Sequence, residues 1–163
     1  MAIFRKKDAT GNLECNFAYM SGLSNYEYKA ATSIKQNDSQ ARLEIRKRAS
    51  NEEPLLLNYS QIIACGVVQN LKIEKDGNNA VSSAVIGGLI LGPIGAIVGG
   101  MSGVGSKGVT IPKCFIINYR PTDNPNDTKA ILLEIVGASL HWDVFVETLK
   151  TKTNALPQQS KQL

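Results

Sequence analysis

The sequence contains little histidine and little cysteine, and neither residue is clustered. His141 is the only histidine among 163 residues, and Cys15, Cys65 and Cys114 stand far apart without a CxxC spacing. A tetrahedral zinc site needs clustered thiolates or imidazoles, so we expect no metal ion and no cofactor. An odd number of scattered cysteines, with no apolar signal-like run before the first charges, is typical of reduced thiols in a cytoplasmic protein.

The sequence also lacks a convincing set of catalytic groups. A hydrolytic triad needs a histidine that a carboxylate orients toward a nucleophile, and Asp143 stands too near His141 along a helix to do so. Residues 100–107 (GMSGVGSK) approach the GxxxxGK[ST] phosphate-binding loop, but the serine and lysine are in reverse order and an apolar segment precedes them. We therefore predict no enzyme and no catalytic residues, and a phosphate- or nucleotide-binding protein is the least favoured alternative.

Charge of one sign is not concentrated anywhere in the chain. The formal net charge is only +4, from 18 basic and 14 acidic residues that are spread along the sequence. A dedicated nucleic-acid binder usually gathers its basic residues on one face, with aromatic residues between them. We expect no nucleic-acid partner, whereas weak attraction to an anionic membrane surface stays open.

Most of the remaining chain has the pattern of short antiparallel strands. Alternating or β-branched runs separated by polar turns predict strands at 26–35, 41–46, 55–57, 63–73, 114–119 and 130–136. In the long run 63–73, the apolar residues Ile63, Cys65, Val67, Leu71 and Ile73 share one parity, so we expect them on one face. The short loop at 121–127 joins the last two strands as a hairpin.

After residue 137, the spacing of apolar residues changes from the two-residue period of a strand to the 3.6-residue period of an α-helix. Ser139 is a suitable N-cap, and Asp143 would lie in the first turn, where the helix dipole favours a negative charge. The apolar stripe of this helix consists of Trp142, Phe145, Val146 and Leu149. We expect the stripe to pack on the sheet. The predicted organisation is a loose lead-in at 1–15, one domain at 16–152 and a flexible tail at 153–163.

Three segments carry a resemblance to a known family. Residues 19–23 (YMSGL), residues 57–62 (LNYSQI) and the helix from Trp142 to Leu149 resemble the bacterial pleckstrin-homology-like (PH-like or GRAM-like) domains. The chain is also similar to small bacterial and phage proteins in which such a domain carries a glycine-rich insertion. The resemblance implies an α+β, mainly antiparallel fold, a PH-like sandwich or barrel with one C-terminal helix, and a binding role without catalytic residues.

The insertion at 80–105 is the most distinctive part of the sequence. Residues 84–101 (AVIGGLILGPIGAIVGGM) contain no charge, and small residues recur at every fourth position in two sets, at 80–92 and at 95–103. On a helix this spacing forms one flat face along which another backbone approaches closely. The residues expected to pack in this way are Ala84, Gly88, Gly92, Gly95, Gly99 and Gly103. The apolar surface around them consists of Val85, Ile86, Leu89, Ile90, Ile94, Ile97 and Val98.

A helical hairpin is the form that we predict for this insertion. Gly92 and Pro93 interrupt its centre, which favours two arms at 80–91 and 94–103, each under about 20 Å long. The strands on both sides are expected to belong to one sheet. A single membrane span between them would put half of the sheet across the bilayer, so both ends of the insertion must lie on the same side.

The apolar surface of the insertion needs a partner, and the sequence leaves three partners open. It could pack on its own domain, on other copies of the chain, or into a membrane as a re-entrant wedge. We predict a non-enzymatic interaction module that, through its glycine-zipper hairpin, forms a homo-oligomer or attaches peripherally to lipid of the inner membrane. The alternative is an oligomer that perturbs or permeates a bilayer. The ligand and the biological process do not follow from the sequence.

Overall fold

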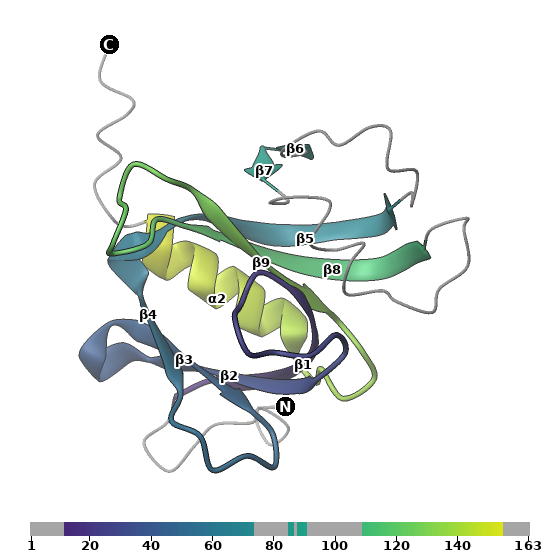
Figure 1. The fold of residues 1–163 in the computed structure, drawn as a ribbon, viewed down its shortest axis with the longest axis horizontal. Helices are drawn as coiled ribbons and strands as arrows, with labels where there is room; N and C mark the ends of the chain where they lie inside the picture. The colour runs from purple at the N-terminus through teal and green to yellow at the C-terminus, as the bar shows by residue number, and fades with distance from the viewer. Residues whose placement is uncertain (1–11, 74–84, 87, 91–108, 155–163) are drawn as a thin grey trace.

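The computed structural model describes residues 12–73, 85–86, 88–90 and 109–154, and these residues form one bent seven-stranded antiparallel sheet, a separate two-stranded sheet and a single α-helix. Seven strands pair in the order β4-β3-β2-β1-β9-β8-β5. They are β1 (Glu14–Ser21), β2 (Ala31–Asn37), β3 (Arg42–Lys47), β4 (Leu55–Asn58), β5 (Ile62–Ile73), β8 (Val109–Tyr119) and β9 (Lys129–Glu134). The helix α2 (Trp142–Asn154) follows β9, as expected, and lies in the bend of the sheet, between β5 and β2 (Figure 1).

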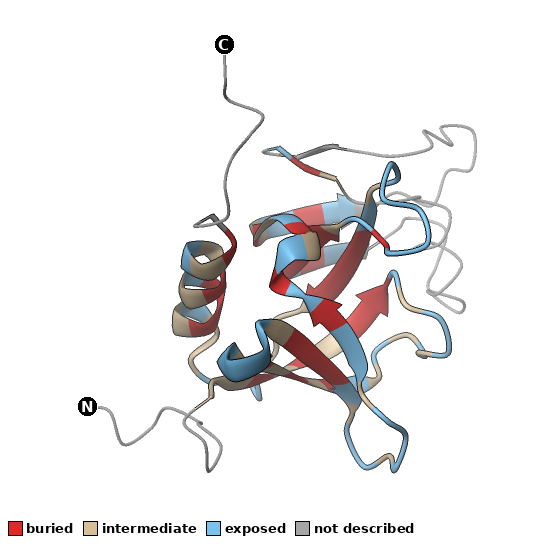
Figure 2. Cartoon of the chain, turned by 90° about the vertical axis from the view of Figure 1, so that its left-hand side faces the viewer, coloured by how far each residue is buried: buried red, intermediate tan, exposed pale blue. Residues whose placement is uncertain are grey.

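The inner face of the sheet carries the larger core, which we call the inner cluster. Phe17, Phe115 and Phe145 meet at its centre, with ring centroids 5.4 to 6.2 Å apart. The predicted helical stripe is confirmed, because Phe145, Val146 and Leu149 are buried and Trp142 packs partly against the same cluster. Figure 2 shows that the buried side of α2 faces the sheet. Each fully buried side chain of this size stabilises the fold by roughly 1.5–3 kcal/mol.

A second apolar cluster, the outer cluster, lies on the opposite face of the same strands. In β8, Phe115 and Ile117 join the inner cluster while Cys114 and Ile116 join the outer one. The continuous apolar run in β8 therefore reflects burial on both faces. The outer cluster consists of Met20, Leu71, Leu89, Ile111, Cys114, Ile116, Ala130 and Leu132.

The alternation predicted for β5 is only partly correct. Cys65 and Val67 pack against the inner cluster, as expected, but Leu71 belongs to the outer cluster and Ile63 is exposed. Ile63 lies where the register with β8 shifts. Asn70 has a φ of 53°, in the left-handed region, and stands between the residues that face inward and Leu71. A bulge and a left-handed residue both break the two-residue period on which the prediction relied.

A set of polar contacts, the helix clasp, fastens α2 to the sheet at Phe145 and at Lys152. Gln36 is fully buried; its Nε2 donates to the Phe145 carbonyl at 2.8 Å and its Oε1 accepts from Lys152 Nζ at 2.6 Å. Lys152 Nζ also lies 2.7 Å from an Asp38 carboxylate oxygen, which accepts a hydrogen bond from the Tyr59 hydroxyl at 2.7 Å. The clasp joins β2, the two short 3-10 turns at Asp38–Gln40 and Tyr59–Gln61, and α2.

Two local predictions outside the insertion are wrong. The strand expected from residue 26 begins only at Ala31, and Lys29 before it has a φ of 64°. Ser139 does not cap the helix, because α2 begins at Trp142 and the Ser139 hydroxyl accepts from the Val136 N–H at 3.0 Å. The serine closes the preceding turn instead, a local bond that competes with capping.

The helical prediction for the insertion is also wrong where the structure describes it. Within the arm expected at 80–91, the strands β6 (Val85–Ile86) and β7 (Leu89–Ile90) pair antiparallel as a short β-hairpin. Gly88 supplies a φ of 82° in the turn, which other residues rarely adopt. Valine and isoleucine favour extended backbone over helix, so tertiary contacts need little to override the glycine spacing. The other arm, at 94–103, lies outside the described residues.

Candidate functional site

The insertion leaves the sheet and returns to it at neighbouring points. Strands β5 and β8 pair antiparallel along their whole length, and the last pair is Ile73 with Val109. The residues between them, 74–108, therefore begin and end side by side at one end of a two-stranded ladder. This confirms that both flanks of the insertion belong to one sheet.

The β6–β7 hairpin packs on the outer face of β5 and β8 (Figure 1). Leu89 is 9% exposed and is the member of the hairpin that enters the outer cluster. Gly66 of β5 lies beneath it, and a Cβ atom at this position would be 3.2 Å from the Leu89 Cδ1 atom. The missing side chain of Gly66 therefore provides the space that Leu89 fills.

The side chain of Asn118 in β8 binds the main chain of the hairpin. The Ile90 N–H donates to Asn118 Oδ1 at 2.8 Å, and Asn118 Nδ2 donates to the Ile90 carbonyl at 2.6 Å. Asn118 is only 1% exposed, so its amide group needs both a donor and an acceptor as partners. The side-chain amide thus replaces a strand backbone and binds the main-chain N–H and carbonyl of one extended residue.

The expected association residues fall partly within this contact. Leu89 is buried, Ile90 is half-buried, and Gly88 is exposed in the turn with no atom within 4 Å of a Cβ placed there. Val85 and Ile86 are placed only as the backbone of β6. The other residues lie outside the described ranges: Ala84, Gly92, Gly95, Gly99 and Gly103, with Ile94, Ile97 and Val98. Their role in association stays a prediction.

Sequence reasoning missed both Gly66 and Asn118. A signal for Asn118 was present, because it interrupts the apolar run of residues 114–119 (CFIINY), and a polar residue in a strand buried on both faces needs a specific partner. Gly66 also interrupts an apolar strand, and such a glycine often marks the close approach of another segment. Neither signal identifies Ile90 or Leu89 as that segment.

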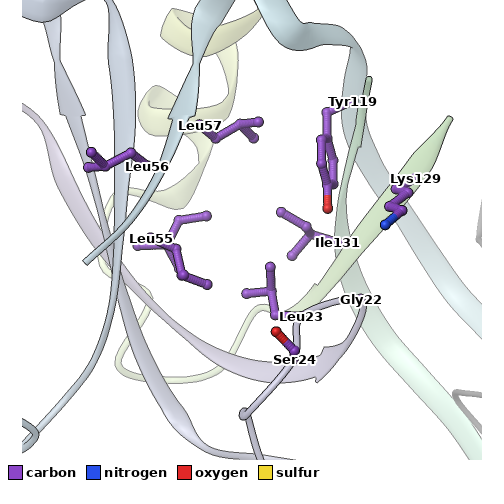
Figure 3. A pocket seen from close by; sticks show the side chains of 10 residues that line it. Gly22, Leu23, Ser24, Leu55, Leu56, Leu57, Tyr119, Lys129 and Ile131 are labelled. Atoms are coloured by element: carbon purple, nitrogen blue, oxygen red, sulfur yellow. The ribbon is translucent and has the colours of Figure 1, made fainter. Parts of the chain in front are cut away.

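A cleft of about 330 Å³ opens between β4 and the ends of β8 and β9 (Figure 3). Its walls are mainly aliphatic, and the Tyr119 hydroxyl, Ser24 and Lys129 add polar groups. Lys129 is exposed and has no ion pair among the residues that the structure describes. The lining residues are Gly22, Leu23, Ser24, Ile45, Leu55, Leu56, Leu57, Tyr119, Lys129 and Ile131.

The loop at one side of the cleft is held rigidly. The Tyr19 hydroxyl donates to the Leu23 carbonyl at 2.9 Å and accepts from the Leu23 N–H at 2.7 Å. Gly22 has a φ of 109°, and a Cβ there would lie 2.0 Å from the Ala130 carbonyl oxygen. A second hollow of about 320 Å³ adjoins this loop, next to Tyr26 and Tyr28. The cleft therefore has one wall that local hydrogen bonds and close packing hold in place.

Two of the cysteine thiols have pKa values that are raised by burial. Burial raises the pKa of Cys65 to about 11, with smaller opposing effects of Lys150 and Thr153, and burial raises the pKa of Cys114 to about 12. Both thiols therefore stay protonated at neutral pH and are poor nucleophiles. His141 stands just before α2 and its carbonyl accepts from the Phe145 N–H, a helix-end position.

Two further observations bear on metals and membranes. Across residues 12–73, 85–86, 88–90 and 109–154, no group of three or more histidine, cysteine, aspartate or glutamate residues could hold a metal ion. In the same ranges, no helix has the length and apolarity that a bilayer crossing requires.

Comparison with known proteins identifies the family. The family model described as "Glycine zipper containing PH domain" matches residues 22–119, more than half of the chain. A search of curated proteins found no match. The matched region extends from the loop at the cleft, through the insertion, to the end of β8, and PH-domain families are typically non-catalytic binding modules. With the seven-stranded antiparallel sheet and the C-terminal helix, this match shows that the chain belongs to the family of PH domains that contain a glycine zipper.

Proposed function

We propose that this protein is a non-catalytic interaction module whose glycine-zipper insertion assembles it with other copies of itself. The observation that carries the proposal is the pair of hydrogen bonds between buried Asn118 and Ile90. These bonds give main-chain groups of the insertion a partner within the protein, and the neighbouring side chain of Leu89 packs in the apolar outer cluster. This described portion of the insertion therefore packs on its own domain.

The composition of the insertion supports the same proposal. The uncharged residues 84–101 carry Ile94, Ile97 and Val98, apolar side chains that need burial. Glycines at every fourth residue, such as Gly95 and Gly99, favour close packing against a second backbone. Because the insertion starts and ends at the paired residues Ile73 and Val109, a second copy can approach it from outside the sheet without disturbing the domain.

Mass in solution tests the proposal. Light scattering after size-exclusion chromatography, over a range of concentrations, should give a defined oligomer for the unaltered chain. Replacing Gly95 and Gly99 together with leucine should weaken assembly by about tenfold or more, because the added side chains prevent close backbone approach. Gly137→Leu is the matched control, since Gly137 is exposed with open space around it and lies far from the insertion in sequence.

The same variants distinguish self-assembly from membrane binding. Co-sedimentation with anionic and with neutral vesicles measures membrane attachment directly. A monomeric mass at every concentration, with pelleting on vesicles, would replace self-assembly with peripheral attachment. Release of a trapped dye from the vesicles would instead favour a membrane-perturbing oligomer. Unchanged mass in the Gly95 and Gly99 variant would remove the zipper from the interface.

A further inference from the structure

We propose that the cleft between β4 and the ends of β8 and β9 binds a small aliphatic carboxylate, a free acid of medium chain length. In this arrangement the apolar chain lies against the leucines and isoleucines of the cleft, and the carboxylate binds Lys129 and the Tyr119 hydroxyl. No described residue of the insertion lines the cleft, so this inference does not depend on the proposed self-assembly.

The floor of the cleft belongs to the inner cluster. Ile45, Leu57 and Ile131 line the cleft and are at most 5% exposed. Leu55, in β4 beside them, is 40% exposed, so water still contacts an apolar side chain at the rim. Tyr119 is the one aromatic residue of the lining, and the other apolar side chains are aliphatic. The cleft therefore favours burial of a saturated chain over stacking of a flat ring.

The polar groups of the cleft are not used by the fold. The hydroxyls of Tyr19, Tyr26 and Tyr59 each donate to an acceptor in the protein, at 2.7 to 3.4 Å. Within the described part of the chain, the Tyr119 hydroxyl has no hydrogen-bond partner and Lys129 has no ion pair. Figure 3 shows both side chains across the cleft from the leucines of β4. Two free donors beside an apolar floor match a ligand with an acceptor at one end.

The positive charge of Lys129 favours an anion, and the setting of the charge favours a carboxylate over a phosphate. The lysine ammonium is a compact point charge that only donates. Phosphate sites usually add arginines or the N-terminus of a helix. None of the ten residues that line the cleft is an arginine or belongs to α2.

The Tyr119 hydroxyl is a protonated donor at neutral pH. Burial raises its pKa, and the charges of Asp123, Tyr19 and Asp127 add smaller increases. The two aspartates also oppose an anion, although neither lines the cleft. We therefore expect binding to depend on Lys129 and to strengthen when one of these aspartates is neutralised.

The volume of the cleft sets the length of the ligand. A space of about 330 Å³ is near the lower end of the range for small-molecule sites, and it equals that of about eleven water molecules at roughly 30 Å³ each. Octanoate, with about ten non-hydrogen atoms, has the matching size. The hydrogen bonds between Tyr19 and Leu23 already order one wall, which lowers the entropic cost of binding.

Titration of the full chain with sodium octanoate, followed by two-dimensional NMR, tests the proposal. Below its micelle-forming concentration, octanoate should shift the amide signals of Leu23, Leu55 and Ile131 until the site is saturated. Octan-1-ol and octylamine have the same chain with a neutral or a positive head group. Both should bind about fivefold or more weakly, because neither forms an ion pair with Lys129. Inorganic phosphate should leave these amide signals unchanged.

Substitutions with matched controls locate the two ends of the ligand. Lys129→Met should weaken octanoate binding about fivefold and leave octan-1-ol binding unchanged. Lys72→Met repeats this change at an exposed lysine of β5 outside the cleft. Leu55→Asp places a like charge on the apolar rim and should weaken octanoate binding about tenfold or more, whereas Leu140→Asp, at a residue that is 63% exposed, is its control.

A change in the opposite direction sharpens the test. Asp123→Asn should strengthen octanoate binding, because it removes a negative charge near Tyr119. Asp123 and Lys129 are both exposed, so their variants test the site even if Leu55→Asp does not fold. Circular dichroism should verify the folding of each protein.

The outcomes distinguish the proposed ligand from its rivals. Shifts confined to another surface, equal affinity for octanoate and octan-1-ol, or unchanged octanoate affinity in Lys129→Met would each overturn the carboxylate site. An acetylated Leu-Leu dipeptide carries a carboxylate at the end of a polypeptide. If the dipeptide binds more tightly than octanoate, the ligand is a chain terminus and the free acid is overturned. None of these results changes the mass in solution, by which the proposed self-assembly is judged separately.

Discussion

The helix α2 and the β6–β7 hairpin each cover one face of the same sheet, but they are held by very different means. The helix buries Phe145, Val146 and Leu149 and is fastened by the helix clasp. In the part of the hairpin whose side chains the structure describes, Leu89 enters the outer cluster and the main chain of Ile90 forms two hydrogen bonds with Asn118. From these contacts we predict that α2 unfolds together with the whole domain, while the hairpin separates from the sheet more readily.

The largest expected difference in the free energy of unfolding comes from truncating one buried side chain in α2 and one in the β6–β7 hairpin. Phe145→Ala should reduce the free energy of unfolding by about 3–5 kcal/mol, because it removes the ring that contacts both Phe17 and Phe115. Leu89→Ala should lower the global value by less than about 1 kcal/mol, because we expect the hairpin to separate before the domain unfolds. Urea denaturation followed by circular dichroism measures both.

The local effect of Leu89→Ala needs a second measurement. Native-state hydrogen exchange should show faster exchange of the Ile90 amide, with the amides of β8 still protected. A loss of global stability as large as that of Phe145→Ala would show that the hairpin is part of the cooperative core and would contradict the comparison.

The second prediction concerns the loss of folding stability at low pH. Burial disfavours the charged form of Asp38, but hydrogen bonds from Lys152 and Tyr59 and the charge of Lys152 outweigh it and lower the pKa. The hydrogen bond from Asn37, with Lys35 and Arg42, lowers the pKa of Glu44 despite its burial. A lowered folded pKa contributes stability above the ordinary carboxyl pKa of about 4, and this contribution is lost as the pH falls through the folded value.

Thermal unfolding between pH 7 and pH 2 checks this expectation. The unfolding temperature should fall below about pH 4, and Asp38→Asn should reduce the slope of that fall because it removes one of the two linked groups. Asp143→Asn, in the first turn of the same helix and exposed, is the control. An identical slope in Asp38→Asn would exclude the helix clasp as an acid-sensitive contact.

The smallest effect is expected at the two thiols, one on each face of β5 and β8. Because burial raises the pKa of both Cys65 and Cys114, alkylation at pH 8 should be slow at each. Peptide mapping after alkylation should find Leu89→Ala accelerating the reaction of Cys114, in the outer cluster, while Cys65 is unchanged. Equal acceleration at both thiols would indicate general loosening instead of hairpin release.

The sequence predicted the parts of the fold that repeat a simple period. Arg42–Lys47 alternates apolar and charged residues, and the helix repeats Phe145, Val146 and Leu149 on one face, so both were located correctly. The pairing of the strands on either side of the insertion was also anticipated. These features depend on local patterns that a single chain displays directly.

The remaining features depend on contacts between distant segments. Asn118 and Ile90 are 28 residues apart, and no period in the sequence relates them. The spacing of Ala84 and Gly88 favoured a helix, yet their neighbours Val85, Ile86, Leu89 and Ile90 are extended where the sheet supplies Gly66 and Asn118 as partners. Tertiary context overrides a local preference of this size.

The pairing of Ile73 with Val109 makes the insertion a removable cassette. Antiparallel partners of this kind lie about 5 Å apart, a gap that a two-residue turn closes. In evolution, the segment between these two residues could therefore be gained, lost or replaced without any change in the order of the strands. A protein engineer could graft a foreign segment at the same junction.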